Sequence, residues 1–381
     1  MKIELGKIYN ISSGGTPSKK CGEYYKDGNI KWVKTGDLKE KYLYDTDECI
    51  TEKGLQSSSA KLYEPDTVLI AMYGATIGAT SILKLKACTN QACAAFCKND
   101  KIMPEYLYYF FKSQKEKFIK DGVGGAQPNI SIGYLRNIRI NLISIDEQRE
   151  IVENLGKIEE LICNEQEQIR QFDVLIKSRF IEMFGDPFTN PKRWEKGLLG
   201  DVCDVRDGTH DSPQYYNEGY PLLTSKNITS GKIDLSNCNY ISEEDFIKIN
   251  ERSKVDIGDI IMPMIGTVGK PLIVDIQPDF AIKNVALIKF GKAVNVRNIY
   301  IKALLESDYF DRSVISKIRG GTQKFIALGD IRKLEILLPT MDMQQKFEDF
   351  AIQVDGLKVT VQKSLDKIQL LFDSLMQEYF G

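Results

Sequence analysis

One long passage of the sequence is written twice. The stretch GVGGAQPNISIGYLRNIRINLISIDEQREIV returns near the end of the chain as IRGGTQKFIALGDIRKLEILLPTMDMQQKFE. Aligning Gly124 with Gly320 sets an offset of 196 residues, and this offset holds without a gap as far as Phe184 and Phe380. A repeat of this length predicts two equivalent halves. The 381 residues also exceed what one ordinary core accommodates, so two domains are expected.

The repeated passage ends in two segments, 146–185 and 342–381, that have the pattern of long amphipathic helices. Their apolar residues recur at steps of three, four or seven between Glu, Gln, Lys and Arg. The predicted apolar seams consist of Ile151, Leu155, Ile158, Ile162, Ile169, Phe172 and Ile176 in the first helix, and of Phe347, Phe350, Val354, Leu357, Val361, Leu365 and Ile368 in the second.

Two amphipathic helices of equal length are expected to bury their seams on each other as an antiparallel coiled coil. About 37 residues at a rise of ~1.5 Å span ~55 Å, which is longer than one domain of this size needs. We therefore predict that the pair separates two domains. The alternative is that each helix packs on its own domain.

The regions before the two helices have the pattern of small mixed domains. Segments such as DTVLIAMYG and GDIIMPMIG are short apolar runs bounded by Gly, Pro and Asp, which is typical of short strands. A helix is expected after them in each region, the first one opening at Pro104. The predicted fold class is α+β, with two domains of small β-sheets and helices separated by the helix pair and related by a pseudo-twofold. The predicted divisions are 1–145, 146–185, 186–341 (a linker and the second domain) and 342–381.

Composition excludes several classes of protein. No apolar run reaches the 18 residues of a membrane span, and the start MKIELGKIYN lacks the apolar core of a secretion signal. We therefore expect a cytoplasmic chain without a membrane. Its eight cysteines are mostly scattered, which favours reduced thiols. Cys88, Cys93 and Cys97 lack zinc-site spacing and have no histidine nearby, so a buried strand is predicted there and no metal.

Charge is distributed unevenly along the chain. The net charge is −2, yet region 1–145 holds 21 basic and 15 acidic residues. The two helical segments together carry −8, and the second non-repeated region is balanced. A basic first domain suits a polyanionic partner. The net charge of the whole chain conceals this local excess of basic residues.

No catalytic site can be assembled from the sequence. His210 is the only histidine. This excludes any catalytic site that needs several histidines, whether to pair with a nucleophile or to form a metal triad. The stretch GTVGK is too short for a phosphate-binding P-loop, and NPKRW is not the Asn-Pro-Pro-aromatic motif of adenine methyltransferases. Any catalysis is therefore expected from a partner.

Several stretches together resemble a known family. They are SSGGTPSKKCGEYYKDGNIKWVKTGDL, DGTHDSPQYYNEGYPLLTSKNI, and the Gly-Gly-x-Gln motif that occurs twice and precedes a polar helix opening with EQ or QQ. In this order and duplication they are similar to the DNA-specificity subunit of type I restriction-modification systems. The resemblance covers nearly the whole chain.

The resemblance implies two target-recognition domains, each reading one half of a bipartite, asymmetric sequence in double-stranded DNA. It implies that the long helices dock two methyltransferase (modification) subunits, with restriction subunits as possible further partners. S-adenosylmethionine, ATP and Mg are then expected in the partner subunits, and none is expected in this non-catalytic chain. Two recognition domains that enter the DNA groove from the same side are expected to lie about one DNA turn, ~34 Å, apart.

Candidate DNA-facing residues are polar residues of loops that correspond between the halves. Lysines and glycine-loop N–H groups suit phosphates, and Asn and Gln amides suit adenine edges. The candidates are Thr16, Lys19, Lys20, Tyr24, Lys34, Tyr73, Thr76, Gln127 and Asn129 in the first domain, and Thr209, His210, Tyr215, Lys226, Asn227, Thr267, Lys270, Gln323 and Lys324 in the second. Each could instead be an ordinary solvated loop residue, Gln127 could be buried, and His210 could be a plain surface side chain.

Two other functions remain open at this point. One is a coiled-coil scaffold without a nucleic-acid role. The other is the specificity region of a fused restriction-methylation enzyme, which the complete-looking start and the missing methyltransferase motif disfavour.

Overall fold

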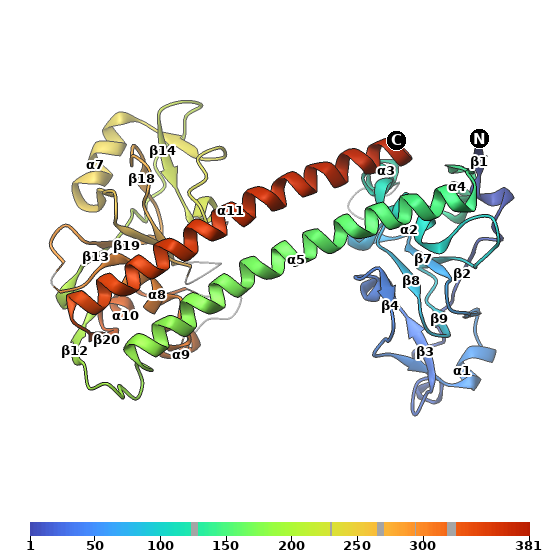
Figure 1. Ribbon diagram of the computed structural model, residues 1–381, viewed down its shortest axis with the longest axis horizontal. Helices are drawn as coiled ribbons and strands as arrows, with labels where there is room; N and C mark the ends of the chain where they lie inside the picture. Colours follow the sequence, from blue (N-terminus) through green and yellow to red (C-terminus); the bar gives the residue numbers. More distant parts are fainter. Residues whose placement is uncertain (123–128, 229–230, 265–269, 294, 318–324) are drawn as a thin grey trace. The chain divides into compact units, whose positions relative to one another are not determined.

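A computed structural model describes residues 1–381 with the exception of 123–128, 229–230, 265–269, 294 and 318–324 (Figure 1). The chain forms two compact units. Unit 1 comprises residues 1–166 and 363–381, and unit 2 comprises residues 167–362. Each unit thus contains part of both long helices, whereas the predicted divisions had set the helices apart from the domains.

Unit 1 contains a two-stranded sheet β1-β11, a five-stranded sheet β2-β10-β7-β8-β4 and a four-stranded sheet β5-β3-β9-β6. The strands are β1 (Lys2–Glu4), β2 (Ser12–Ser13), β3 (Ile30–Val33), β4 (Tyr42–Leu43), β5 (Cys49–Ile50), β6 (Leu62–Tyr63), β7 (Val68–Ala71), β8 (Thr80–Leu83), β9 (Ala87–Thr89), β10 (Cys93–Phe96) and β11 (Arg139–Asn141). All four residues of β7, β8 and β10 are buried, which explains the continuous apolar sequence of β7 and β10.

Short helices cover the sheets of unit 1. They are α1 (Glu52–Gln56), α2 (Pro104–Ser113), α3 (Lys115–Asp121) and α4 (Ile132–Asn137), with 3-10 turns η1 (Leu5–Lys7), η2 (Gly22–Tyr24), η3 (Thr35–Asp37) and η4 (Gly74–Thr76). Pro104 occupies the first turn of α2, as predicted, where its missing N–H costs nothing. The hydroxyl of Ser131 accepts the Tyr134 N–H at 3.0 Å and caps α4.

Unit 2 repeats this plan with fewer strands. Its sheets have the orders β12-β20, β13-β19-β16-β17 and β15-β14-β18. The strands are β12 (Glu195–Leu198), β13 (Asp204–Asp207), β14 (Tyr220–Leu223), β15 (Asn239–Ile241), β16 (Ile260–Pro263), β17 (Leu272–Ile273), β18 (Ala281–Ile282), β19 (Val285–Lys289) and β20 (Glu335–Leu338). The helices are α6 (Leu199–Val202), α7 (Glu243–Ser253), α8 (Asn298–Leu305), α9 (Asp308–Ser313) and α10 (Leu328–Arg332), with 3-10 turns η5 (Ser225–Ile228) and η6 (Ile315–Lys317).

The sheets of the two units correspond over most of their strands. The order β2-β10-β7-β8 matches β13-β19-β16-β17, with every pair antiparallel. The parallel pair β3-β9 matches the parallel pair β14-β18. The regions 1–145 and 194–341, whose sequences echo each other only weakly, therefore share the order and direction of these strands, although β4 and β6 of unit 1 have no counterpart among the described strands of unit 2. This confirms the predicted α+β class and the internal repeat.

The two long helices are α5 (Ile145–Phe184) and α11 (Met341–Phe380), each an uninterrupted helix of 40 residues (Figure 1). Their bounds lie one residue from the predicted bounds. Ser144 and Glu147 form a reciprocal cap at the start of α5, with the Ser144 N–H donating to the Glu147 carboxylate at 2.8 Å. Gly185 ends α5 with a φ of 81°, where a β-carbon would lie 2.6 Å from the Pro191 ring.

The last turn of each long helix closes the core of a unit through an aromatic contact. In unit 1, Phe380 packs on Tyr106 with ring centroids 5.2 Å apart. In unit 2, the residue matched to Phe380, Phe184, packs on Tyr300 at 4.8 Å. The Tyr106 hydroxyl donates to the carbonyl of Asn141, and the Tyr300 hydroxyl donates to that of Leu337. The same aromatic contact and the same tyrosine hydrogen bond therefore occur in both units.

Within each unit the helices α5 and α11 run antiparallel and share a seam. In unit 1 the Ser364 hydroxyl donates to Glu165 at 2.9 Å, and in unit 2 Lys358 forms an ion pair with Asp173. Thirteen of the fourteen predicted seam residues are buried or half-buried. The apolar residues that α11 buries most fully are Phe347, Ala351, Val354, Phe372, Met376 and Phe380.

Leu357 is the exception, and its prediction as a seam residue was wrong. Its side chain is 56% exposed. The helix turns so that the next residue, Lys358, faces α5, because steps of four and then three from Val354 keep the seam on one side. Lys358 is also the residue that the 196-residue offset matches to the seam residue Ile162.

Candidate nucleic-acid interface

The loop that follows β2 in unit 1 is held by its backbone. The Gly15 N–H donates to the Thr89 carbonyl at 2.9 Å, and the Trp32 indole N–H donates to the Gly15 carbonyl at 3.1 Å. A β-carbon on Gly14 would lie 1.9 Å from the Thr89 carbonyl oxygen. Only glycine allows the two backbone segments to approach this closely, and this contact fixes the position of the loop.

Three further segments adjoin this loop. The Thr16 hydroxyl bonds to the side-chain oxygen of Gln91, in the turn between β9 and β10. The same turn accepts the Met72 N–H at the Ala92 carbonyl, at 2.8 Å. Tyr73, the next residue, forms an isolated bridge with Asn129. The structure thus brings together Thr16, Tyr73 and Asn129 from sites far apart in the sequence.

Unit 2 builds the same frame from different residues. The Gly208 N–H donates to the Val285 carbonyl and the Thr209 N–H to the Ile282 carbonyl, both at 3.0 Å. A β-carbon on Gly208 would lie 2.2 Å from the Ile282 oxygen. The bond from the Ile326 N–H to Met264, at 2.9 Å, matches the bond from Ile130 to Met72 in unit 1, at 3.0 Å.

His210 occupies the tip of this loop in unit 2. Its Nε2 lies 2.8 Å from an Asp207 carboxylate oxygen, and its Nδ1 lies 2.8 Å from the Asn284 side-chain oxygen. The hydrogen bonds to Asn284 and Asp207 raise the pKa of His210 above its ordinary value. The imidazole remains 61% exposed.

The other predicted residues of unit 1 are placed as follows. Lys19 and Lys20 are exposed on the loop after β2. Tyr24 is half-buried, and the Thr76 hydroxyl donates to the Tyr73 carbonyl at 3.2 Å. Lys34 forms an ion pair with Glu48. The carboxylate offsets the positive charge that Lys34 could otherwise offer to a phosphate.

The remaining predicted residues of unit 2 divide into exposed and buried. Tyr215 is 45% exposed, and Lys226 and Lys270 are exposed too. Asn227 is buried, because its amide oxygen accepts the Thr224 N–H at 3.0 Å and its amide nitrogen donates to the Asp234 carbonyl at 3.2 Å. The prediction of Asn227 as a DNA-facing residue does not fit this position.

Four predicted residues, Gln127, Thr267, Gln323 and Lys324, lie outside the described residues. Two residues that the sequence did not single out lie at this candidate interface, namely Gln91 and Asn284. Each carries an amide at the turn that leads out of a β-strand, beside Thr16 and His210 respectively. The signal available in the sequence was an amide residue two positions after each of the corresponding strands β9 and β18.

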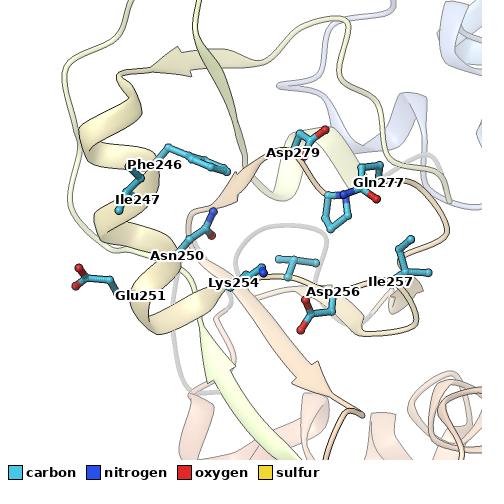
Figure 2. A pocket seen from close by; sticks show the side chains of 11 residues that line it. Phe246, Ile247, Asn250, Glu251, Lys254, Asp256, Ile257, Gln277 and Asp279 are labelled. Carbon is cyan, nitrogen blue, oxygen red and sulfur yellow. The ribbon is translucent and has the colours of Figure 1, made fainter.

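A groove of about 640 Å³ lies beside α7 in unit 2. Figure 2 shows Phe246 and Asn250 of α7 pointing toward the segment that contains Gln277 and Asp279. The carboxylates of Glu251, Asp256 and Asp279 line it against the single lysine Lys254. This acidic lining does not suit a phosphate backbone.

The side chains of the described residues do not form a metal centre. No group of three or more His, Cys, Asp or Glu residues that could hold a metal ion occurs among the residues with assigned positions. Cys88 and Cys93 are buried in β9 and β10, and burial raises the pKa of each thiol to about 12. No helix in the described part of the chain is long and apolar enough to cross a membrane.

Comparison with known proteins gives the same duplicated pattern. Residues 1–171 and 191–369 each match the type I restriction modification DNA specificity domain. The chain is 27% identical to the type I restriction enzyme MjaIX specificity subunit of Methanocaldococcus jannaschii, over 98% of this chain and 90% of that protein.

Two solved structures share the fold. One is the S subunit of a type I restriction-modification system from M. genitalium, with a TM-score of 0.54, 15% identity and coverage of 100% of this chain and 96% of that one. The other belongs to a study of complex assembly and conformational transition of the type I R-M system, with a TM-score of 0.62, 17% identity and coverage of 100% and 97%. With the family model matched twice over most of its length, the chain belongs to the type I restriction-modification DNA specificity family.

Proposed function

We propose that unit 1 and unit 2 each read one half of a split target in double-stranded DNA, and that the two halves differ. The observation that carries this proposal is the repeated backbone frame with different side chains at its tip. Thr16 and Gln91 occupy the frame in unit 1, and His210 and Asn284 occupy it in unit 2. A common frame with unlike polar groups suits two readers of unlike sequence.

The family assignment identifies a DNA target-recognition subunit of a type I restriction-modification system, and such specificity subunits are non-catalytic. This confirms the resemblance and the prediction that the chain is not an enzyme. It does not favour a scaffold without a nucleic-acid role or a piece of a fused enzyme. Within the proposed interface, Lys19 and Lys20 would hold phosphates, and the Gln91 amide would face a base edge.

The partners proposed for the helices are two identical methyltransferase subunits. Support comes from six exposed apolar residues that the 196-residue offset matches in three pairs, Leu161 with Leu357, Val174 with Leu370, and Leu175 with Leu371. Three of them lie in unit 1 and three in unit 2, and we refer to these sets as the first and the second helix patch. The first consists of Leu161, Leu370 and Leu371, and the second of Val174, Leu175 and Leu357.

Each helix patch combines residues from both helices of its unit. Glu165 lies beside Ser364 in the antiparallel pair, so Leu161, one turn earlier on α5, lies at the level of 368–371 on α11. Two patches with the same make-up fit two copies of one protein. S-adenosylmethionine, ATP and Mg then belong to the partner subunits, and the assembly would act in the cytoplasm.

The test is to co-express the chain with its methyltransferase subunit and to sequence the modified adenines in the host DNA. We expect one bipartite motif with an unread spacer. Gln91→Ala should relax one half of the motif and Asn284→Ala the other half. An uninterrupted motif, or relaxation of the same half by both variants, would contradict the proposal.

A further inference from the structure

The ring of His210 is bound at both nitrogens by oxygen atoms. Asp207 contributes a carboxylate oxygen and Asn284 an amide oxygen, each 2.8 Å away. A neutral imidazole has one donor and one acceptor nitrogen, so it satisfies only one of the two oxygens. An imidazolium donates to both. The geometry therefore fits a ring that carries two protons.

The charged groups around the ring are of both signs. Asp207 lies beneath it with only 8% of its side chain exposed, and its other oxygen pairs with Arg252 at the end of α7. Lys283, from the turn between β18 and β19, directs its ammonium to the Ser212 hydroxyl, and Asp211 is exposed next along the loop. With an imidazolium, Asp207, Arg252 and His210 sum to one positive charge. With a neutral imidazole they sum to zero.

The hydrogen bonds of the His210 ring connect the tip of the loop to the end of β13 and to the turn between β18 and β19. Asp207 ends β13, and Asn284 has a φ of 55° in the turn before β19. The Asn284 N–H also donates to the Thr209 carbonyl at 3.1 Å, so the amide side chain and the backbone of this residue hold the same loop. In unit 1 the frame position of His210 is occupied by Thr16, whose hydroxyl does not titrate in this pH range.

We propose that His210 is a positioning residue of unit 2, which as an imidazolium clamps the loop 208–212 to Asn284 in its DNA-reading conformation. This inference rests on the proposed DNA-recognition function and gives one reader a pH dependence that the other lacks. Because both ring N–H groups are occupied, His210 orients its neighbours and does not read a base edge. A nearby phosphate backbone would stabilise the cation further.

The direction of the pH dependence follows from the protonated form. The clamp is complete below the ordinary histidine pKa and is lost as the pH rises through the raised pKa. Binding of DNA should therefore take up part of a proton at neutral pH. The affinity should fall with rising pH, by no more than about tenfold per pH unit, which is the limit for one proton.

The first arm of the test uses the full chain without DNA. Since His210 is the only histidine, ¹⁵N-histidine labelling gives ring resonances that need no assignment. We expect both nitrogens in the protonated range at pH 6.5 and a midpoint above that value. A ring with one unprotonated nitrogen at pH 6.5 would show a neutral tautomer beside a rotated Asn284 amide and would overturn the proposal.

The second arm measures affinity of the assembled methyltransferase complex for its target duplex between pH 6.5 and 8.5. The wild type should lose affinity several-fold, and His210→Gln should have a flat profile close to the wild type at pH 8.5. Duplexes with one half-site scrambled should place the difference in the half read by unit 2. Equal pH profiles for the two proteins would refute the clamp. Absence of sequence-specific binding by the wild type at every pH would instead refute the proposed function, and the first arm would then decide on His210.

Discussion

Gln148 and Gln344, 196 residues apart, make the same three hydrogen bonds in the two units. The Gln148 side-chain oxygen accepts the Met103 N–H, and the Gln344 oxygen accepts the Arg297 N–H, both at 2.8 Å. The Gln148 amide nitrogen donates to the carbonyls of Lys101 and Ile143, and that of Gln344 donates to those of Asn295 and Pro339. Both glutamines are fully buried. Each one therefore ties the first turn of a long helix to the segment before α2 or α8.

Replacing Gln148 by leucine should destabilise unit 1 by about 3 kcal/mol, because three buried backbone groups lose their partners. Each unit contains one of the two tryptophans, Trp32 in unit 1 and Trp194 in unit 2. Urea unfolding followed by Trp32 fluorescence in a Trp194→Phe background would measure the change. Gln166→Leu, at an exposed position of α5, is the control and should shift the midpoint little. Equal shifts for both variants would show that the buried amide contributes nothing specific.

Two neighbouring substitutions on α11 should separate folding from assembly. Val354 is 4% exposed in the seam and Leu357 is 56% exposed in the second helix patch. Val354→Asp should cost several kcal/mol of stability because it buries a carboxylate. Leu357→Asp should leave the melting temperature unchanged but reduce the bound methyltransferase subunits from two to one, as measured by native mass spectrometry. Leu370→Asp should do the same through the first helix patch. Two bound copies in the Leu357→Asp variant would remove this patch from the docking surface.

Charge reversal of Lys19 and Lys20 together should weaken binding to all DNA sequences to a similar degree. Loss of two phosphate contacts should reduce the slope of log affinity against log salt by about 2. Lys157→Glu, on the exposed side of α5, is the control. Filter binding of the assembled complex at several salt concentrations would give the slopes. An unchanged slope in the double variant would place both lysines outside the interface.

Unit 1 should carry a pH-dependent contribution from Glu159 on α5. Burial disfavours its charged form, but hydrogen bonds from Lys112 at 2.7 Å and Tyr109 at 2.6 Å outweigh this and lower the pKa of Glu159 below 4.5. The stabilisation is therefore present above pH 4.5 and is lost as the pH falls through the lowered pKa. Glu159→Gln should cost about 2 kcal/mol at pH 7.

The cost of Glu159→Gln should shrink below pH 4.5, because glutamine resembles the protonated acid. Trp32 fluorescence during urea unfolding at pH 7 and at pH 3.5 would measure both values. A cost that stays constant over this range would mean that Glu159 acts through its shape and not through its charge.

The length of α5 and α11 should set the spacer of the DNA target. Seven extra helical residues after Gln166 and seven after Gln362, where the chain passes between the units, would lengthen both helices by ~10 Å and preserve the seam. At ~3.4 Å per base pair the motif should gain about three spacer bases. Methylated-base sequencing would show this, and new half-sites at the old spacing would contradict it. An insertion after Phe184 is unsuitable, because Phe184 is buried in the core of unit 2.

The helices could be predicted to within one residue because a gap-free repeat and a regular apolar pattern specify them jointly. The seam failed at Leu357, where counting hydrophobic residues favoured a leucine over Lys358, whose long side chain reaches an ion pair with Asp173. The division into domains differed from the compact units because a helix that is long in sequence can pack half of its length on each of two cores.

The interface was harder to predict, since loop residues carry no periodic signal. Asn227 has the polar amide expected of a DNA-facing residue. Its side chain is nevertheless buried, because the amide bonds to the carbonyl of Asp234 and to the N–H of Thr224. The partner of His210 lies 74 residues further along the chain at Asn284, and only the strand order brings the two together. Side-chain pairing across a sheet edge depends on topology, which single loops do not encode.

The composition of unit 1 constrains the order in which the protein can mature on the ribosome. Phe372, Met376 and Phe380 complete the core that begins with Leu5, whereas unit 2 is formed by one continuous stretch. All residues of unit 2 are therefore synthesised before the last segment of α11, which covers the core of unit 1. The first domain to be translated is the last to be closed. A released chain that ends at Gln362 would carry one complete unit and one open core, which is the state most in need of a chaperone.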